Sequence, residues 1–313
     1  MTLRSHAAIG PLFAVIGVLG FSFKAILVKL AYAAHPVLDA ATLLTWRMIY
    51  AAPLFTLMAW FAERQPGAIR MQRRDVLTVI GLGFIGYYLS SYLDFAGLHY
   101  ITASLERLIV FTYPAIVVLL SAFIYRKPVT RRTLIALVLC YIGVVLVFLH
   151  DLRVADSGRD VALGGFLVFM SAILYAIYLV FAGPAIARLG SQRFIAWAML
   201  TSSVFVFGQF ALIHPITSLA IPPAVHWLSL TMAVFSTVLP TWLMAEALKR
   251  IGASRASIVG SLGPVFTIGF GAMLLDEPMH AIQLAGAALV LAGVWQVTQK
   301  PSTAREAQTT ASP

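Results

Sequence analysis

The chain has 313 residues, of which 60% are apolar and 11% are charged, and its net charge is +10. Lipid must be its solvent, because a soluble chain of this size could not cover so much apolar surface with polar side chains. The excess of basic residues therefore indicates loops beside anionic lipid and argues against a nucleic-acid partner. Because one helical crossing takes about 20 apolar residues, we expect an all-α integral membrane protein with roughly ten spans.

Ten apolar segments follow one another along the chain, each bounded by charged residues, prolines or turn residues. A helix satisfies its own backbone hydrogen bonds in lipid, so each segment is predicted to cross the bilayer as a helix. The connections are short, and the single cysteine, Cys140, excludes an intramolecular disulfide. A disordered cytoplasmic tail is predicted for residues 299–313. The predicted spans are residues 9–31, 39–61, 75–95, 102–124, 132–150, 162–182, 194–213, 225–247, 254–274 and 281–298.

The distribution of lysine and arginine predicts the orientation. If the N-terminus is cytoplasmic, the cytoplasmic segments hold 16 of these residues, whereas the outer loops hold only Arg153 and Arg159. Cytoplasmic loops of membrane proteins are enriched in basic residues. We therefore expect a multi-pass membrane protein with both termini in the cytoplasm.

An internal repeat relates the two halves of the chain. Residues 101–148, shifted by 150 positions without a gap, match residues 251–298 with 11 identities in 48 positions, including both prolines of each segment and a glycine. Each half holds five predicted spans, and because five is odd the second half must be inverted in the membrane. Inverted repeats are common in secondary transporters, in which two halves expose one central site alternately.

Two stretches carry a family resemblance. Residues 247–257, followed by Pro264 and by the run Leu274-Leu275-Asp276-Glu277-Pro278, resemble the second EamA-type domain of the drug/metabolite transporter superfamily. Residues 98–104, with Pro114 and Pro128, show the same frame in the first half. The resemblance covers residues 9–298. It implies ten helices in two inverted five-helix domains, residues 9–150 and 162–298, and export of amino acids, related metabolites or xenobiotics across the inner membrane.

Ionisable side chains within the spans are candidates for function, because charge is costly in lipid. Lys24 and Arg47 lie deepest, and either a substrate or gating role or a structural pairing with Glu106 or Asp94 explains them. Asp94, Glu106 and Arg107 lie nearer the span ends, where they act in coupling or gating or anchor the helices at the interface. An electropositive wall would suit a carboxylate or phosphate on the substrate, held by Arg47 through two hydrogen bonds.

Aromatic side chains form a second candidate group. Rings with a polar tip suit the wall of a small-molecule cavity, although they also pack helices together or lie in interfacial belts. The resemblance implies a cavity lined by spans one, three, four, six, eight and nine, which favours cavity lining for the residues within those spans. The predicted substrate-binding aromatic residues are Tyr88, Tyr113, Tyr175, Tyr178 and Trp242.

Pro114 and Pro264 occupy equivalent positions in the two halves and are expected to kink their spans at a site or hinge. The sequence contains no P-loop, no H-E-x-x-H and no G-x-S-x-G motif, and its histidines are scattered. We therefore expect neither a cofactor nor a metal site, and no enzyme activity. The predicted function is export of a small metabolite, such as an amino acid or related carboxylate, by alternating access. A multidrug or cationic-compound exporter of the same fold is the alternative, ahead of a membrane-embedded enzyme or a sensor, and the oligomeric state is left open.

Overall fold

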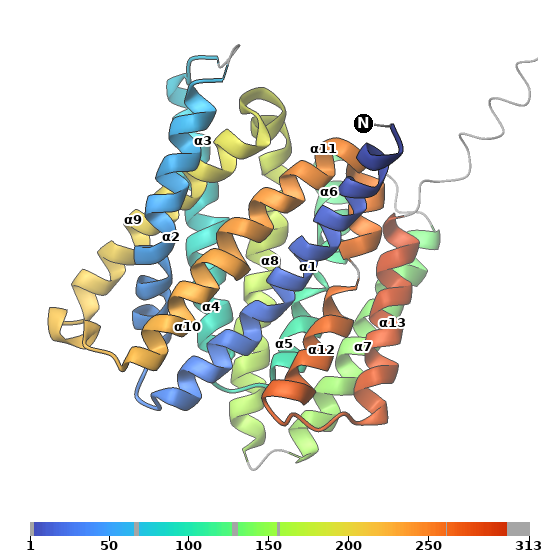
Figure 1. The fold of residues 1–313 in the computed structure, drawn as a ribbon. Helices are drawn as coiled ribbons and strands as arrows, with labels where there is room; N and C mark the ends of the chain where they lie inside the picture. The colour runs from blue at the N-terminus through green and yellow to red at the C-terminus, as the bar shows by residue number, and fades with distance from the viewer. Residues whose placement is uncertain (1–2, 66–68, 127–130, 155–156, 261, 299–313) are drawn as a thin grey trace, which may run out of the picture.

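The computed structural model describes residues 3–65, 69–126, 131–154, 157–260 and 262–298, and the predicted tail at 299–313 lies outside them. Over these ranges the chain is a bundle of helices with no strand (Figure 1). Up to residue 154 the elements are α1 (Leu3–Ala34), α2 (Ala40–Glu63), α3 (Arg73–Gly83), the π-helical turn η1 (Phe84–Leu89), α4 (Ser90–Gly97), α5 (Ala103–Val110), α6 (Tyr113–Tyr125) and α7 (Arg131–Val154). The remaining elements are α8 (Gly158–Leu189), α9 (Ser191–Ile213), the 3-10 turn η2 (Ile216–Leu219), α10 (Pro223–Ala233), the π-helical turn η3 (Val234–Val238), α11 (Leu239–Gly260), α12 (Gly263–Leu274) and α13 (Ala281–Thr298).

The helical segments are those of a multi-pass membrane protein. Seven helical stretches of the described chain are long and apolar enough to cross a membrane, and two shorter apolar helices cover residues 263–274 and 281–296. The other predicted span corresponds to α2, which has 24 residues. The connection predicted at residues 248–253 is absent: α11 continues through it to Gly260, so the first seven residues of the predicted span 254–274 belong to α11. Leu248, Lys249 and Arg250 are strong helix formers, which explains why the helix does not end there.

Irregular features recur at equivalent places in the two halves. The π-helical turns begin at Phe84 and Val234, and the helices α6 and α12 begin at Tyr113 and Gly263, in each case 150 residues apart. Arg126 and Asp276, also 150 apart, follow the ends of these helices with positive φ angles of 52° and 53°. The structure therefore repeats the spacing found in the sequence, down to local departures from α-helical geometry.

The predicted proline kinks are complete breaks. Pro114 lies in the first turn of α6, two residues beyond the gap that follows α5, and Pro264 lies in the first turn of α12. Proline lacks the backbone N–H that a helix interior requires, but the first turn leaves that donor unused. Each break thus starts a new helix, which changes direction more freely than a kinked one.

The packing of α7 against α13 is reciprocal. A Cβ atom on Gly143 would lie 2.6 Å from the carbonyl oxygen of Gly286, and one on Gly293 would lie 2.5 Å from that of Ala136. A shift of 150 residues converts one pair into the other, because Gly143 is equivalent to Gly293 and Ala136 to Gly286. Between them the Cys140 thiol contacts the carbonyl oxygen of Val290, its own equivalent, at 3.6 Å. Reciprocal contacts of this kind are typical of a two-fold axis running between two elements.

Substitution of Gly143 tests this contact. Gly143→Ala is expected to lower the free energy of unfolding by about 1–3 kcal/mol, because the new methyl group meets backbone rather than a movable side chain. Gly208→Ala is the matched control, since nothing lies within 4 Å of its Cβ position. Thermal unfolding of the two variants in detergent measures the difference. Equal melting temperatures would contradict the close approach of α7 and α13.

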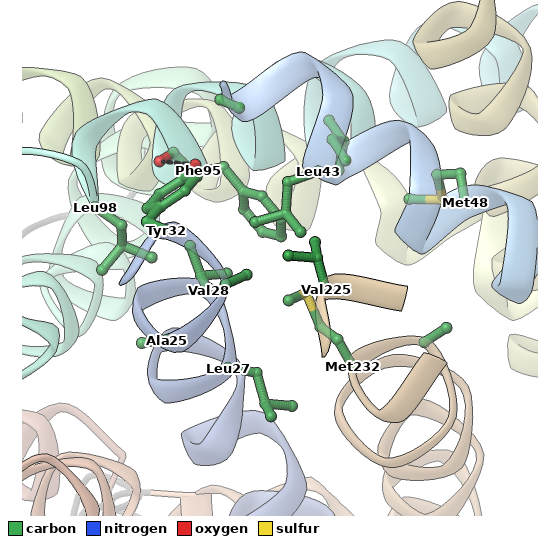
Figure 2. Packing of buried hydrophobic residues seen from close by; sticks show 14 of the residues in the cluster. Ala25, Leu27, Val28, Tyr32, Leu43, Met48, Phe95, Leu98, Val225 and Met232 are labelled. Atoms are coloured by element: carbon green, nitrogen blue, oxygen red, sulfur yellow. Dashed lines mark hydrogen bonds between the residues drawn. The ribbon is translucent and has the colours of Figure 1, made fainter. Parts of the chain in front are cut away.

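A buried apolar cluster joins α1, α2, α4 and α10 (Figure 2). Each of these helices contributes a fully buried side chain to the cluster: Val28, Leu43, Phe95 and Met232. The Tyr32 hydroxyl donates a hydrogen bond of 2.8 Å to the carbonyl oxygen of Phe95, drawn as a dashed line in Figure 2. This contact holds the last turn of α4 against α1, and so positions the residue that precedes Phe95.

Candidate functional site

An ionic cluster lies where α1, α4 and α5 meet. The Lys24 ammonium group donates to Asp94 Oδ2 at 2.5 Å and to Glu106 Oε1 at 3.2 Å. Asp94 and Glu106 are 3% and 0% exposed, and the Lys24 side chain is 19% exposed. Lys24 thus contacts both carboxylates that were expected as its structural partners. Because an unpaired buried charge is strongly unfavourable, this triad holds the three helices together.

Two arginines belong to the same cluster. Arg47 is buried, its guanidinium carbon lies 4.7 Å from the centre of the Phe95 ring, and it makes no hydrogen bond within the described chain. Arg107 is also buried, donates to Ser22 Oγ at 3.4 Å and lies 5.1 Å from the centre of a phenylalanine ring. Asp94 interacts electrostatically with both arginines. The structure therefore brings together five of the side chains predicted from the sequence.

The cluster contains three cationic side chains and two carboxylates, and part of its hydrogen-bonding capacity is unused. Four of its buried atoms have no hydrogen-bond partner: Arg47 Nε, Arg107 Nε, Asp94 Oδ1 and Glu106 Oε2. A buried polar atom without a partner costs about 1–3 kcal/mol. Unpaired donors and unpaired acceptors in one place can be satisfied together by a ligand that carries both an anionic and a cationic group.

The connection between α4 and α5 is held at its backbone. Lys29 Nζ donates to the carbonyl oxygens of Leu98 and Ile101 at 3.2 and 3.1 Å. The His99 ring stacks on Tyr32 with centroids 3.6 Å apart, and its burial lowers the pKa of this histidine, which favours the neutral ring. These contacts fix the spacing between the last turn of α4 and the first turn of α5, which supply the two carboxylates.

Glu277, from the connection between α12 and α13, caps the N-terminus of α5. Its Oε1 accepts a hydrogen bond from the backbone N–H of Ala103 at 2.7 Å. Its Oε2 accepts from the N–H and the hydroxyl of Ser104 at 3.2 and 2.7 Å. A carboxylate satisfies the free N–H groups of a first turn and complements the helix dipole. Glu277 belonged to the sequence motif, but its contact with the other half could not be inferred from it.

Substitution of Glu277 is expected to weaken α5. Glu277→Gln removes the negative charge and one acceptor, which should lower the free energy of unfolding by about 1–2 kcal/mol. Asp276→Asn makes the same acid-to-amide change one residue earlier, and asparagine tolerates the positive φ of 53° found there, so it is the control. Chemical denaturation of both variants checks the difference, and equal stability would show that the cap contributes nothing.

The predicted tyrosines of α6 and α8 meet in an aromatic cluster. The Tyr113 and Tyr175 rings are 5.2 Å apart edge to face, and the Tyr175 and Tyr178 rings are stacked at 5.6 Å. The cluster includes Tyr87 of η1, whose hydroxyl lies 2.8 Å from that of Tyr178. Phe111 joins it to the ionic cluster, because its ring lies 5.1 Å from the Arg107 guanidinium carbon and 6.1 Å from the Tyr113 ring.

Two predicted aromatic residues have other neighbours. Tyr88 packs against Phe205 of α9, with ring centroids 5.8 Å apart. Trp242 of α11 is 40% exposed and contacts Phe13 at 6.0 Å. The structure therefore places Tyr88 and Trp242 outside the group formed by the tyrosines of α6 and α8.

The two prolines start helices that border the clusters. Pro114 follows Tyr113 of the aromatic cluster directly. Gly263, which precedes Pro264, accepts a hydrogen bond from Ser22 Oγ at 3.1 Å, and the Thr267 hydroxyl donates back to the Ser22 carbonyl at 3.1 Å. Ser22 and Thr267 were not predicted from the sequence, because isolated hydroxyl groups are common in membrane helices. They attach α12 to α1 beside Arg107.

Elsewhere, Glu63 at the end of α2 receives two hydrogen bonds from Arg193 of α9, Nε to Oε1 at 2.7 Å and Nη2 to Oε2 at 2.6 Å, and a third from Trp197. Both carboxylate oxygens of Glu63 thus have hydrogen-bond partners, whereas the ionic cluster contains buried polar atoms that have none. Within the residues that the structure describes, no three histidine, cysteine, aspartate or glutamate side chains lie together in a way that could hold a metal ion.

A helical bundle with apolar spans and a buried ionic cluster defines this chain as a multi-pass membrane protein with a polar interior, the class that includes transporters. Residues 8–149 and 162–299 each match the EamA-like transporter family, and the chain belongs to that family. It is 32% identical to the uncharacterized transporter YcbK of Bacillus subtilis over 90% of both chains. It is 25% identical to a protein of Salmonella typhimurium named probable amino-acid metabolite efflux pump, over 56% of this chain and 60% of the other. A solved crystal structure of a protein aligns with a TM-score of 0.61 at 15% identity, covering 99% of this chain and 100% of the other, which shows a shared fold.

Proposed function

We propose that this protein is a secondary transporter of the cell inner membrane that exports an amino acid or a related carboxylate by alternating access. Its two five-helix repeats, residues 9–150 and 162–298, would be inverted relative to one another and would expose one central site in turn. The two separate matches to the family and the reciprocal contacts between α7 and α13 support this arrangement.

One observation carries the choice of substrate: the ionic cluster has unpaired donors on Arg47 and Arg107 and unpaired acceptors on Asp94 and Glu106. A carboxylate suits the guanidinium groups, and an ammonium group suits the carboxylate oxygens. An amino acid carries both. The name of the Salmonella relative, which mentions amino-acid metabolites, is in line with this choice.

Counterflow in proteoliposomes tests the proposal. Vesicles are loaded with an unlabelled metabolite mixture and exposed to labelled amino acids, organic acids and cationic drugs in turn. We expect accumulation of zwitterionic or acidic compounds, and loss of at least tenfold in rate for Arg47→Ala. Arg64→Ala is the matched control, because Arg64 lies at the end of α2 with its guanidinium 3.6 Å from the centre of the Trp60 ring, away from the cluster.

Cationic compounds are the second candidate substrates, and the aromatic cluster favours them. The Tyr175 ring lies 5.2 Å from the Tyr113 ring and 5.6 Å from the Tyr178 ring, and the faces of such rings can bind a cation. Arg107 beside them opposes a cationic ligand by repulsion. Exchange restricted to cationic drugs, with Arg47→Ala unaffected, would replace the amino-acid proposal with this one, and absence of all exchange by folded protein would remove both.

The proposed topology has a separate test. With the N-terminus in the cytoplasm, the connection after α1 and the connection after α9 are on the outside, and the connection after α8 is inside. Single cysteines introduced at Val37, Ile216 and Gly190 into a Cys140→Ser background should react with a membrane-impermeant reagent in intact cells at the first two positions only.

A further inference from the structure

Glu277 joins the two halves of the chain at the N-terminus of α5. It belongs to the second half, and its carboxylate accepts hydrogen bonds from the backbone N–H of Ala103 and the hydroxyl of Ser104, both at 2.7 Å. A Cβ atom on Gly271 of α12 would lie 2.8 Å from Glu277 Oε2, so the missing side chain at Gly271 leaves room for the carboxylate. In the proposed topology this contact lies at the outer surface.

The last turn of α5 is also attached to α12. Arg107 donates to Ser22 Oγ at 3.4 Å, and a Cβ atom on Gly263 of α12 would lie 2.8 Å from Arg107 Nη2. Within the described residues α5 also packs against α1, whereas α6, the inner part of the same predicted span, packs mainly against α8. The outer part of this span therefore closes against the second half, and Glu106 and Arg107 of the ionic cluster lie one turn deeper than the cap.

A second contact of this kind cannot form at the equivalent place in the other half. A shift of 150 residues relates Ser104 to Ser254 and Glu277 to Lys127. Position 127 lies outside the described residues, but a lysine ammonium group carries donors only and cannot accept from backbone N–H groups. The helix α11 also continues through Ser254, so no helix begins there as α5 begins at Ala103. The contact of α7 with α13 is different, because the repeat maps it onto itself.

We propose that Glu277 is the latch of an outer gate: its contact with α5 closes the outer end of the path to the ionic cluster and breaks when the carrier opens outward. A contact that a two-fold axis maps onto itself can persist in both states of an inverted-repeat carrier, whereas a contact without an equivalent belongs to one state. The latch therefore sets a resting state in which the site is closed to the outside. This inference rests on the proposed transport function and adds a gating residue to it.

Labelling of a cysteine behind the latch tests the gate without any substrate. Thr267 is buried and lies four residues further from the outer end of α12 than Gly271. Thr267→Cys is made in a Cys140→Ser background and exposed in intact cells to a membrane-impermeant maleimide. Removal of an interaction that exists in one state alone shifts the population toward the other state. We therefore expect Glu277→Gln to raise the labelling rate at least tenfold, and Asp276→Asn to leave it unchanged.

Two further variants separate opening of the gate from general loosening of the fold. Gly143→Ala weakens the packing of α7 on α13 but leaves the latch intact, so labelling of Thr267→Cys should stay at its original rate. Gly271→Ala displaces the Glu277 carboxylate and should raise the rate as Glu277→Gln does, which keeps the test available if the latter does not fold. An unchanged rate in both latch variants, or an equal rise in Gly143→Ala, would overturn the proposal.

A disulfide across the gate gives the opposite perturbation. A Cβ atom on Gly271 would lie 3.3 Å from Ser104 Oγ, close enough for a disulfide between cysteines at these positions. In the Cys140→Ser background, oxidation of Ser104→Cys/Gly271→Cys should lower counterflow of a labelled amino-acid mixture at least tenfold, and a reductant should restore it. Each single variant under the same oxidant is the control. Exchange by the cross-linked protein at the reduced rate would reject the gate and leave the transport function standing, whereas faster labelling of Thr267→Cys in protein without any exchange would support the gate and reject the proposed substrate.

Discussion

Replacement of Lys24 by methionine is expected to have the largest effect on stability of any single change in the cluster. Methionine fills a similar volume but leaves Asp94 and Glu106 without the ammonium group that contacts both. Removal of one partner from a buried ion pair costs about 3–5 kcal/mol, because the other charge is left uncompensated. Unfolding of Lys24→Met in detergent, followed by circular dichroism, should show this loss, and transport should fall below detection.

A matched substitution lies five residues further along the same helix. Lys29→Met removes two hydrogen bonds to backbone carbonyl groups, which are neutral, so a loss of about 1–3 kcal/mol is expected. The double variant Lys24→Met/Glu106→Gln should regain part of the stability lost in Lys24→Met, since one uncompensated charge is removed. If Lys24→Met is as stable as Lys29→Met, the triad does not hold the helices together.

Much of the fold could be predicted because lipid imposes one strong rule. Every backbone polar group must be paired, so apolar segments of sufficient length become helices. The positions of the breaks at Pro114 and Pro264 could be predicted, because proline lacks the backbone N–H. The prediction was of a kink within one helix, whereas the structure has the end of one helix and the start of another. The continuation of α11 through Arg250 could not be predicted, because charged residues are compatible with both a helix and a connection between spans.

The candidate site, like the fold, could be predicted from the sequence only in part. Charged residues in apolar segments are conspicuous, so Lys24 and Arg107 could be identified from the sequence alone. Their partners come from helices about 70 to 85 positions away in the chain, and only the packing assigns them. The aromatic prediction included Tyr88, whereas it is Tyr87, in the π-helical turn at residues 84–89, that joins the cluster through its contact with Tyr178. A π-helical turn changes the direction in which successive side chains point, and the sequence does not announce such a turn.

Replacement of Arg47 by methionine is expected to separate stability from function. Arg47 is 4% exposed, makes no hydrogen bond within the described chain and has an unpaired Nε, so its burial is unfavourable apart from the contact with Phe95 and the attraction of Asp94. A buried charged group can often be replaced by an apolar one without loss of stability. Arg47→Met should therefore unfold at the same temperature as the wild type or a higher one.

The same variant should lose at least tenfold in counterflow of amino acids, because the carboxylate would have lost a guanidinium partner. A residue kept at the expense of stability is typical of a binding site. Arg193→Met provides the contrast: that arginine makes two hydrogen bonds to Glu63, so its loss should lower the melting temperature. Reduced stability of Arg47→Met with unchanged transport would assign Arg47 to the structure and exclude it from the substrate site.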